Sequence, residues 1–241
     1  MTLKEFFSAH PKAALAFSGG TDSAYLLHAA REAGADVQPY FIQTPFQPKF
    51  ELEDAKRLAP DLTVLSLDIL TIPNVANNPE NRCYFCKKAL FSHLKAQAET
   101  DGYAVLLDGT NATDQWEDRP GMRALGELGV LSPLRLCGLT KDKIRQLSKE
   151  AGLFTWDKPA YACLATRVQN GAEITVEDLQ RVEQSEEILR KMGYFDLRIR
   201  LFYGAARVQL PENQLKNADI FAIRKALSPY FDHILLDLRG R

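Results

Sequence analysis

The sequence has few cysteines, no long apolar run and no excess of basic residues, and each absence excludes a class of protein. Four cysteines in 241 residues are too few for a secreted disulfide scaffold. No stretch approaches the roughly 20 apolar residues of a membrane span, and we find no signal-peptide pattern at the N-terminus. Lys and Arg total 30 against 31 for Asp and Glu, which disfavours a nucleic-acid partner. We therefore expect a cytoplasmic protein that binds neither membranes nor nucleic acid.

The order of apolar and amphipathic segments predicts the fold class. Over most of the chain, short apolar runs alternate with helical patterns, which indicates an α/β fold: an open parallel sheet with helices on both faces. We expect strands at 13–17, 37–43, 62–67 and 104–107, and helices at 22–33, 51–58, 82–98 and 140–151.

After Pro159 the pattern changes to that of a small α+β unit. Thr175 begins a helix that ends near 191. Two alternating runs, 197–201 and 206–210, predict a β-hairpin. A helix at 213–226 and a strand at 233–238 follow. We place the domain boundary between residues 1–166 and 167–241.

A loop rich in serine and glycine, Ser18–Ser23 (SGGTDS), joins the first expected strand to its helix. Glycines let the backbone approach a ligand, and the N–H groups at a helix N-terminus attract phosphate. Serine hydroxyls can donate to phosphate oxygens, and Asp22 can help to hold Mg²⁺. A bare Gly-Gly turn would be only a tight connection. The full string, however, resembles the signature of the PP-loop ATP pyrophosphatases, which grip the pyrophosphate of ATP and transfer AMP to a substrate oxygen.

The cysteines indicate a second chemistry. Cys83 and Cys86 form a CxxC pair, which alone is consistent with half a zinc site, a redox pair or coincidence. No histidine has the spacing of a fourth zinc ligand. With Cys163, a three-cysteine zinc or iron–sulfur site with one open position is the more economical interpretation. Cys137 lies in an apolar stretch and is expected to be a buried small hydrophobe.

Several motifs follow the loop in a fixed order: NRCYFCK (81–87), DGTN (108–111), RPG (119–121), SPL (132–134), KP (158–159) and ACL (162–164). This set resembles the LarE family over nearly the whole chain. LarE proteins are ATP-dependent sulfur insertases that help to make the nickel-pincer nucleotide cofactor of lactate racemase. The resemblance implies an enzyme that adenylates a carboxylate of a pyridinium mononucleotide and inserts sulfur to give a thiocarboxylate. It also implies that residues 1–166 form a PP-loop ATP pyrophosphatase domain and 167–241 a substrate-binding and oligomerisation domain.

The family obtains its sulfur in two ways. One branch sacrifices the cysteine of the Ala-Cys-Leu motif, which ends as dehydroalanine. Another branch holds a [4Fe-4S] cluster on three cysteines, with an extra sulfide on the fourth iron. Because this chain carries Cys83, Cys86 and Cys163, we favour the cluster as metal site, supplied by a sulfide donor.

The resemblance further implies roles for single residues. ATP phosphates and Mg²⁺ would be bound by residues of the loop and of the DGTN motif: Ser18, Gly19, Gly20, Asp22, Ser23, Gly109 and Asn111. The catalytic residues would be Cys163, Asp22 and Glu186.

Two arginines on one face of an expected strand, Arg198 and Arg200, would bind the substrate phosphate, with a solvated strand face as the alternative. Where relatives tend to carry an acidic residue, this chain has Gln209. Family members assemble as hexamers, so a homo-oligomer is expected.

Three other functions stay open. A PP-loop tRNA thiolase would predict a basic surface, which the net charge of -1 does not favour. An amide-forming ligase that uses ammonia, with a structural zinc on the CxxC pair, would leave Cys163 unexplained. A nucleotide-binding scaffold without catalysis would not need the intact Ser18, Asp22 and Ser23.

Overall fold

The computed structural model describes residues 1–114 and 120–241. Arg119 of the RPG motif therefore lies outside the described residues. Contacts divide the chain into two compact units, Met1–Pro73 with Asn81–Ala160 and Asn74–Glu80 with Tyr161–Arg241. Among the described residues, none of the helices has the length and apolar character needed to cross a bilayer.

The first unit is built on a four-stranded parallel sheet in the order β3-β2-β1-β4. The strands are β1 (Lys12–Ala16), β2 (Asp36–Gln43), β3 (Thr63–Ser66) and β4 (Leu106–Leu107). The predicted open parallel sheet is thus confirmed.

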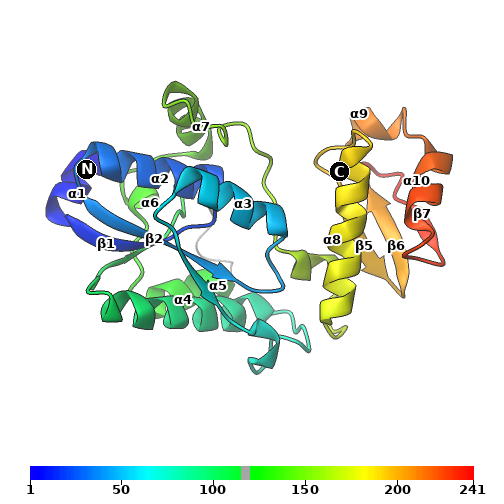
Figure 1. Cartoon of the computed structure of the whole chain (residues 1–241), viewed down its shortest axis with the longest axis horizontal. Coiled ribbons are helices and arrows are strands. Elements are labelled where there is room, and N and C mark those ends of the chain that lie inside the picture. The colour runs from blue at the N-terminus through cyan, green and yellow to red at the C-terminus, as the bar shows by residue number, and fades with distance from the viewer. Residues whose placement is uncertain (115–119) are drawn as a thin grey trace. The chain divides into compact units, whose positions relative to one another are not determined.

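Helices cover both faces of this sheet because β1 is apolar on both sides (Figure 1). Ala13 and Leu15 pack on one face, whereas Ala14 packs on the other. The first face is covered by α1 (Leu3–Ala9), α2 (Thr21–Glu32), α3 (Lys49–Leu58), α6 (Pro133–Leu136) and α7 (Lys141–Glu150). The second face is covered by α4 (Arg82–Thr100) and α5 (Pro120–Glu127). A short 3₁₀ helix, η1 (Ile69–Thr71), follows β3.

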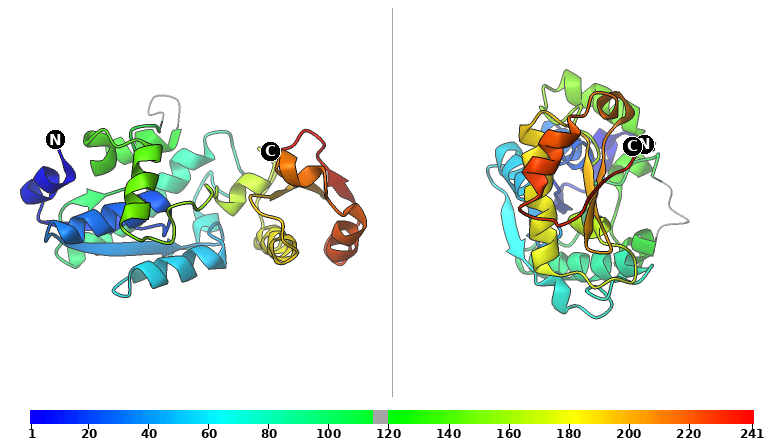
Figure 2. Two further views of the ribbon diagram at one scale, coloured as in Figure 1. Left: turned by 90° about the horizontal axis from the view of Figure 1, so that it is seen from above. Right: turned by 90° about the vertical axis from the view of Figure 1, so that its right-hand side faces the viewer.

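The second unit contains a three-stranded mixed sheet in the order β5-β6-β7. β5 (Arg198–Phe202) and β6 (Ala205–Gln209) form the predicted antiparallel hairpin, and β7 (Ile234–Leu236) pairs parallel to β6. Two helices, α8 (Val176–Lys191) and α10 (Ile220–Leu227), lie against one face of the sheet, as Figure 2 shows. The unit also contains the 3₁₀ helix η2 (Leu164–Arg167). The predicted small α+β architecture is confirmed.

The single helix expected at 213–226 is wrong. The segment forms a short helix, α9 (Glu212–Leu215), and then α10 begins anew at Ile220. Asp219 causes the break, because its Oδ1 accepts a hydrogen bond from the backbone N of Ala222 at 2.9 Å and so caps the second helix. Its own backbone N–H donates to the hydroxyl of Tyr194 at 3.0 Å rather than continuing the first helix.

Candidate active site

The strand order of the first unit places a ligand site at one point of its sheet. From β1 the chain proceeds to β2 and β3 on one side, and β4 then adds on the other side of β1. In open α/β sheets, ligands bind at the carboxyl ends of the two strands that flank such a reversal. The loop Ser18–Ser23 follows β1 and the DGTN motif follows β4, so both predicted nucleotide-binding segments lie at this point.

The loop after β1 has a backbone that only glycine can adopt without strain. Gly19 has a φ of +68°, and a Cβ at this position would lie 3.0 Å from the backbone N of Ala55. The hydroxyls of Ser18 and Ser23 lie 3.1 Å apart. No described side chain caps the first turn of α2 after Gly20. The uncapped N–H groups and the helix dipole therefore form a site for an anion.

The DGTN motif lies directly against this loop. A Cβ on Gly109 would approach the backbone N of Ser23 to 3.1 Å, so a larger residue would push the two segments apart. Asp108 is buried and accepts a hydrogen bond from Ser132 Oγ at 2.6 Å, which fixes the motif from behind. The side-chain carbonyl of Asn111 accepts from the backbone N of Thr113 at 2.8 Å and holds the following turn. The structure thus brings Gly109 and the PP-loop together.

Asp22 is the charged residue of the loop, and its two carboxylate oxygens have different surroundings. Its Oδ2 accepts a hydrogen bond from Lys141 Nζ at 2.7 Å. Its Oδ1 is buried and has no hydrogen-bond partner among the described residues. Burial raises the pKa of Asp22 above its ordinary value, and the nearby Asp114 carboxylate adds to the rise, whereas the Lys141 ammonium and the Asn111 side chain act to lower it. A buried carboxylate oxygen without a donor is a suitable ligand for a hard divalent cation, so the residues present fit Mg²⁺.

Lys141 is a site residue that the motifs did not identify. It reaches the loop from the first turn of α7, far along the chain from Asp22. The sequence contains one signal for it. Lys141 and Lys143 lie in the first turn after the N-cap Thr140, where the helix dipole disfavours positive charge. A residue that breaks a local rule in this way often marks a functional position.

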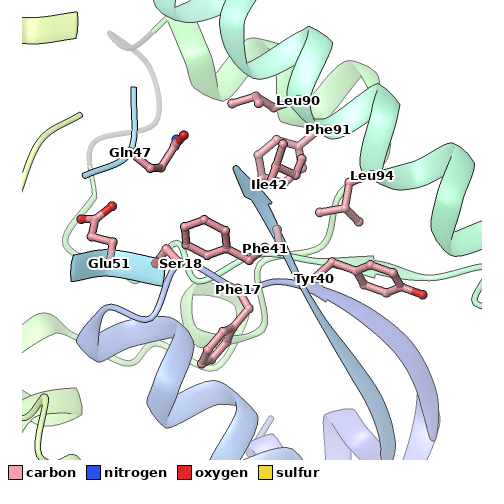
Figure 3. Close-up of a pocket in the computed structure, with 11 residues that line it drawn as sticks. Phe17, Ser18, Tyr40, Phe41, Ile42, Gln47, Glu51, Leu90, Phe91 and Leu94 are labelled. Atoms are coloured by element: carbon pink, nitrogen blue, oxygen red, sulfur yellow. The ribbon is translucent and has the colours of Figure 1, made fainter. Parts of the chain in front are cut away.

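An apolar cavity of about 190 Å³ opens beside Ser18 (Figure 3). Phe41 and Ile42 of β2 line it, and Leu90 and Phe91 of α4 close it from the opposite side. Gln47 and Glu51 supply its polar side chains. The cavity adjoins the anion site and suits a flat apolar group.

The CxxC pair lies at the start of α4, on the helix that lines this cavity. Cys83, Cys86 and Leu90 follow one another at spacings of three and four residues, which places them on one helix face. Neither cysteine forms a disulfide; Cys83 is exposed and Cys86 is half-buried. Arg82 Nη2 donates to Cys83 Sγ at 3.6 Å. Cys137 is half-buried, rather than fully buried, against the apolar residues on the first face of the parallel sheet. Burial raises the pKa of its thiol.

The third predicted cysteine ligand belongs to the other unit. Cys83 and Cys86 lie in the first unit and Cys163 in the second. Over residues 1–114 and 120–241, no three His, Cys, Asp or Glu side chains form a metal-binding group. The three-cysteine site stays a prediction.

In the second unit, Glu186 and Arg167 form a fully buried ion pair. Both side chains are 0% exposed, and Arg167 Nε lies 2.8 Å from Glu186 Oε1. Glu186 also accepts hydrogen bonds from the Tyr161 hydroxyl at 2.6 Å and from the backbone N of Ile199 at 2.9 Å. Burial acts to raise the pKa of Glu186, but the Arg167 charge and these donors outweigh it, so the pKa lies below its ordinary value.

The same arginine holds the loop that carries Cys163. Arg167 Nη1 donates to the carbonyl of Ala162 at 2.7 Å and to that of Cys163 at 3.3 Å. Cys163 is half-buried and precedes the 3₁₀ helix η2. The predicted catalytic residues Cys163 and Glu186 are therefore linked, but through Arg167.

The two predicted phosphate-binding arginines differ in their surroundings. Arg198 is only 4% exposed, which rules out a solvated strand face, and its guanidinium carbon lies 4.7 Å from the centre of the Tyr161 ring. Burial lowers the pKa of Arg198 to about 10, and the Arg167 charge adds to this. Arg200 instead lines a cavity of about 270 Å³ together with Arg167 and Arg207.

Gln209 lies beside this basic cavity. Its Oε1 accepts from Arg200 Nε at 2.9 Å, and its Nε2 donates to Asp237 Oδ2 at 2.8 Å. The Gln209 amide thus links Arg200 to Asp237, which directly follows β7. Arg200 and Arg207, which are paired across the hairpin, line the cavity, and two guanidinium groups at one cavity suit an anionic ligand.

The chain is similar to three curated proteins over most of its length, although no family model matches it. It is 39% identical over 219 residues to an uncharacterized protein of Synechocystis sp., a match that covers 89% of this chain and 82% of that protein. It is 34% identical over 214 residues to an uncharacterized protein of Methanocaldococcus jannaschii, a match that covers 89% of this chain and 83% of that protein. It is 32% identical over 235 residues to the pyridinium-3,5-bisthiocarboxylic acid mononucleotide synthase of Lactiplantibacillus plantarum, covering 94% of this chain and 85% of that enzyme. At this identity and coverage, the chain belongs to the family of that synthase, the LarE family.

Proposed function

We propose that the protein is an ATP-dependent sulfur transferase that forms AMP and pyrophosphate and converts carboxylates of a pyridinium mononucleotide into thiocarboxylates for the nickel-pincer nucleotide cofactor. One observation carries the proposal. The loop Ser18–Ser23, Gly109 and the unpaired Asp22 Oδ1 converge at the switch point of the sheet, in a chain related to a named bisthiocarboxylic acid mononucleotide synthase. The name of that relative specifies a product with two thiocarboxylates on a pyridinium ring.

The first unit supplies the residues that would bind ATP. The N-terminus of α2 with the hydroxyls of Ser18 and Ser23 would hold the phosphates, and the apolar cavity beside Ser18 would take the adenine ring. Asp22 and Asn111 would complete the site, with Asp22 as a ligand of Mg²⁺. Bound Mg²⁺ would supply neutralisation of the phosphate charge.

The chemistry then consists of two displacements. A carboxylate oxygen of the substrate attacks the α-phosphorus of ATP, pyrophosphate leaves, and an acyl adenylate forms. A sulfur nucleophile next attacks the acyl carbon, the bond from this carbon to the AMP oxygen breaks, and AMP leaves with its electron pair. The carboxylate has then exchanged one oxygen for sulfur. The α2 N-terminus would hold the charged phosphates throughout the first step.

We propose a [4Fe-4S] cluster held by Cys83, Cys86 and Cys163 as the site from which sulfur is delivered. The proposal is supported by two cysteines one turn apart on α4 and a third in the Ala-Cys-Leu motif, none of them in a disulfide, because three thiolates are the donor set of such a cluster. A cluster with three protein ligands would supply an open iron position for an exchangeable sulfide, which a sulfide donor must replenish. Cys163 as a sacrificial donor is the alternative.

The basic cavity of the second unit would bind the phosphate of the mononucleotide. Arg200 and Arg207 line this cavity, and Arg198 lies on the same strand as Arg200. Arg167 is held in place by Glu186. In this proposal Glu186 acts through Arg167 on the Cys163 loop, because its carboxylate is already engaged by three donors. We also propose that the second unit mediates assembly into a homo-oligomer, a hexamer by analogy with the family, in the cytoplasm.

The test is the release of pyrophosphate from ATP in the presence of pyridinium-3,5-dicarboxylic acid mononucleotide. The wild type should release pyrophosphate and AMP with this substrate, and Asp22→Asn should abolish release while the fold is retained in circular dichroism. Release that occurs only with ammonia as nucleophile, or only with tRNA as substrate, would replace the proposal by an amide ligase or a tRNA thiolase.

A further inference from the structure

The ion pair between Lys141 and Asp22 is a feature that the proposed function does not yet use. Lys141 Nζ lies 2.7 Å from Asp22 Oδ2, and the two side chains are 31% and 23% exposed. The other oxygen of Asp22 is buried and unpaired among the described residues. One oxygen of the carboxylate is therefore occupied by an ammonium group, whereas the other is buried with no ion pair among the described residues to offset its charge.

The fold holds α7 at this position through two connections. The backbone N of Ala112, directly after the DGTN motif, donates to the carbonyl of Leu139 at 2.8 Å. Thr140 Oγ1 then caps α7 by accepting from the backbone N of Lys143 at 3.4 Å. The first turn of α7 is thus tied to the same loop that approaches the PP-loop at Gly109.

Lys141 and the neighbouring Lys143 differ in the groups that their ammonium groups contact. Both lysines lie in the first turn of α7, where positive charge is unfavourable. Lys143 Nζ bonds to Gln146 on its own helix at 3.2 Å, on the surface. Only Lys141 reaches the carboxylate of the candidate metal ligand. A lysine stem is flexible, so its ammonium can exchange one anionic partner for another over a few ångströms.

We propose that Lys141 is a catalytic residue with two successive partners, an inference that rests on the proposed function. Without nucleotide, its ammonium neutralises Asp22 and competes with the divalent cation for that carboxylate. With the metal nucleotide bound, Asp22 would become a ligand of the cation, and Lys141, repelled by the cation's charge, would move onto the phosphates. There it stabilises the negative charge that develops on the leaving pyrophosphate.

Three variants test this assignment: Lys141→Met, Lys141→Arg and, as matched control, Lys143→Met. We expect Lys141→Met to lower kcat for pyrophosphate release by about 10²- to 10³-fold, as loss of one preorganised donor does elsewhere. The Mg²⁺ concentration for half-maximal rate should fall at the same time, because the competing ammonium is gone. Lys141→Arg should restore part of kcat, and Lys143→Met should match the wild type in both quantities.

A binding measurement gives a second readout that does not depend on turnover. Mn²⁺ should bind to the nucleotide-free Lys141→Met protein several-fold more tightly than to the wild type in a titration followed by electron paramagnetic resonance, and Asp22→Asn should bind least. Equal Mn²⁺ affinity of Lys141→Met and wild type would overturn the competition, and an unchanged kcat would overturn the catalytic role. If the wild type itself releases no pyrophosphate from ATP, the proposed function fails, but the Mn²⁺ comparison still decides whether Lys141 shields Asp22.

Discussion

Replacing Glu186 by Gln should destabilise the second unit by about 3–5 kcal/mol, because it leaves the Arg167 guanidinium charged and buried without a counter-ion. The side chains of both residues are 0% exposed, so water cannot take over the lost interaction. Glutamine keeps the shape of glutamate and can still accept a hydrogen bond from the backbone N of Ile199. The change removes the negative charge and replaces one acceptor oxygen, Oε2, which now contacts the Tyr161 hydroxyl and Arg167 Nη2, by a donor.

The same reasoning predicts that removing both charges is much less harmful than removing one. In Arg167→Met with Glu186→Gln, neither charge of the pair is left in the core, and the glutamine can still accept a hydrogen bond from the backbone N of Ile199. Replacing a buried ion pair in this way is often neutral or stabilising. Stability should return in this double variant, but sulfur transfer should not. The carbonyls of Ala162 and Cys163 would have lost the donor that holds their loop.

Hydrogen exchange followed by mass spectrometry measures both effects locally. Peptides that cover α8 and β5 should exchange faster in Glu186→Gln by about two to four decades, since each 1.4 kcal/mol is a factor of ten. Peptides that cover β1 in the first unit serve as an internal control. A double variant as labile as Glu186→Gln would refute the assignment of the loss to an unpaired buried charge.

Three further predictions follow from the described contacts. The folded-state pKa of Glu186 lies below its unfolded value. Its contribution to stability is therefore complete above its ordinary pKa of 4.5 and is lost as the pH falls through the folded-state value. Urea unfolding from pH 7 to pH 3 should show a loss of stability in acid that Glu186→Gln lacks. Gly19→Ala should abolish ATP binding in calorimetry, because a Cβ would meet Ala55 at 3.0 Å in a backbone with positive φ; ATP binding at wild-type affinity would contradict the loop geometry. Cys83→Ala should lose iron and acid-labile sulfide while it keeps pyrophosphate release, whereas full multi-turnover sulfur transfer by this variant would exclude the cluster.

The architecture was predictable where local pattern and tertiary packing agree. Apolar runs such as Ala13–Phe17 are followed at once by loop and helix signals, so the parallel sheet and the PP-loop connection could be inferred together. The hairpin of β5 and β6 followed from strict alternation around Tyr203-Gly204. In both cases the residues within the element are sufficient to predict it.

Two further features carry local signals in the sequence. Helix α1 was not predicted, although Thr2 and Glu5 form a complete capping box, with Thr2 N donating to Glu5 Oε2 at 2.7 Å. The helix expected at 213–226 includes Asp219, whereas the side chain of this residue begins a new helix. Aspartate is a better N-cap than an interior helix residue, so the break was available from sequence.

The remaining features depend on contacts between distant parts of the chain. Asn78 belongs to the second unit because its Nδ2 donates to the carbonyl of Gln169 at 2.8 Å and its carbonyl accepts from Gly171 N. The partner of Asp22 is 119 positions away on α7. No periodicity or motif encodes which lysine meets which aspartate, so such pairs emerge only when the elements are packed together.

The central claim is tested most directly by mass spectrometry of the mononucleotide product. Anaerobically purified protein is incubated with ATP, Mg²⁺, a sulfide source and pyridinium-3,5-dicarboxylic acid mononucleotide, with Asp22→Asn as the control. The account predicts that the wild type replaces carboxylate oxygen by sulfur in step with the release of AMP and pyrophosphate, and that the variant does neither. ATP cleavage without any sulfur-containing product, or sulfur incorporation in the absence of ATP, would contradict it.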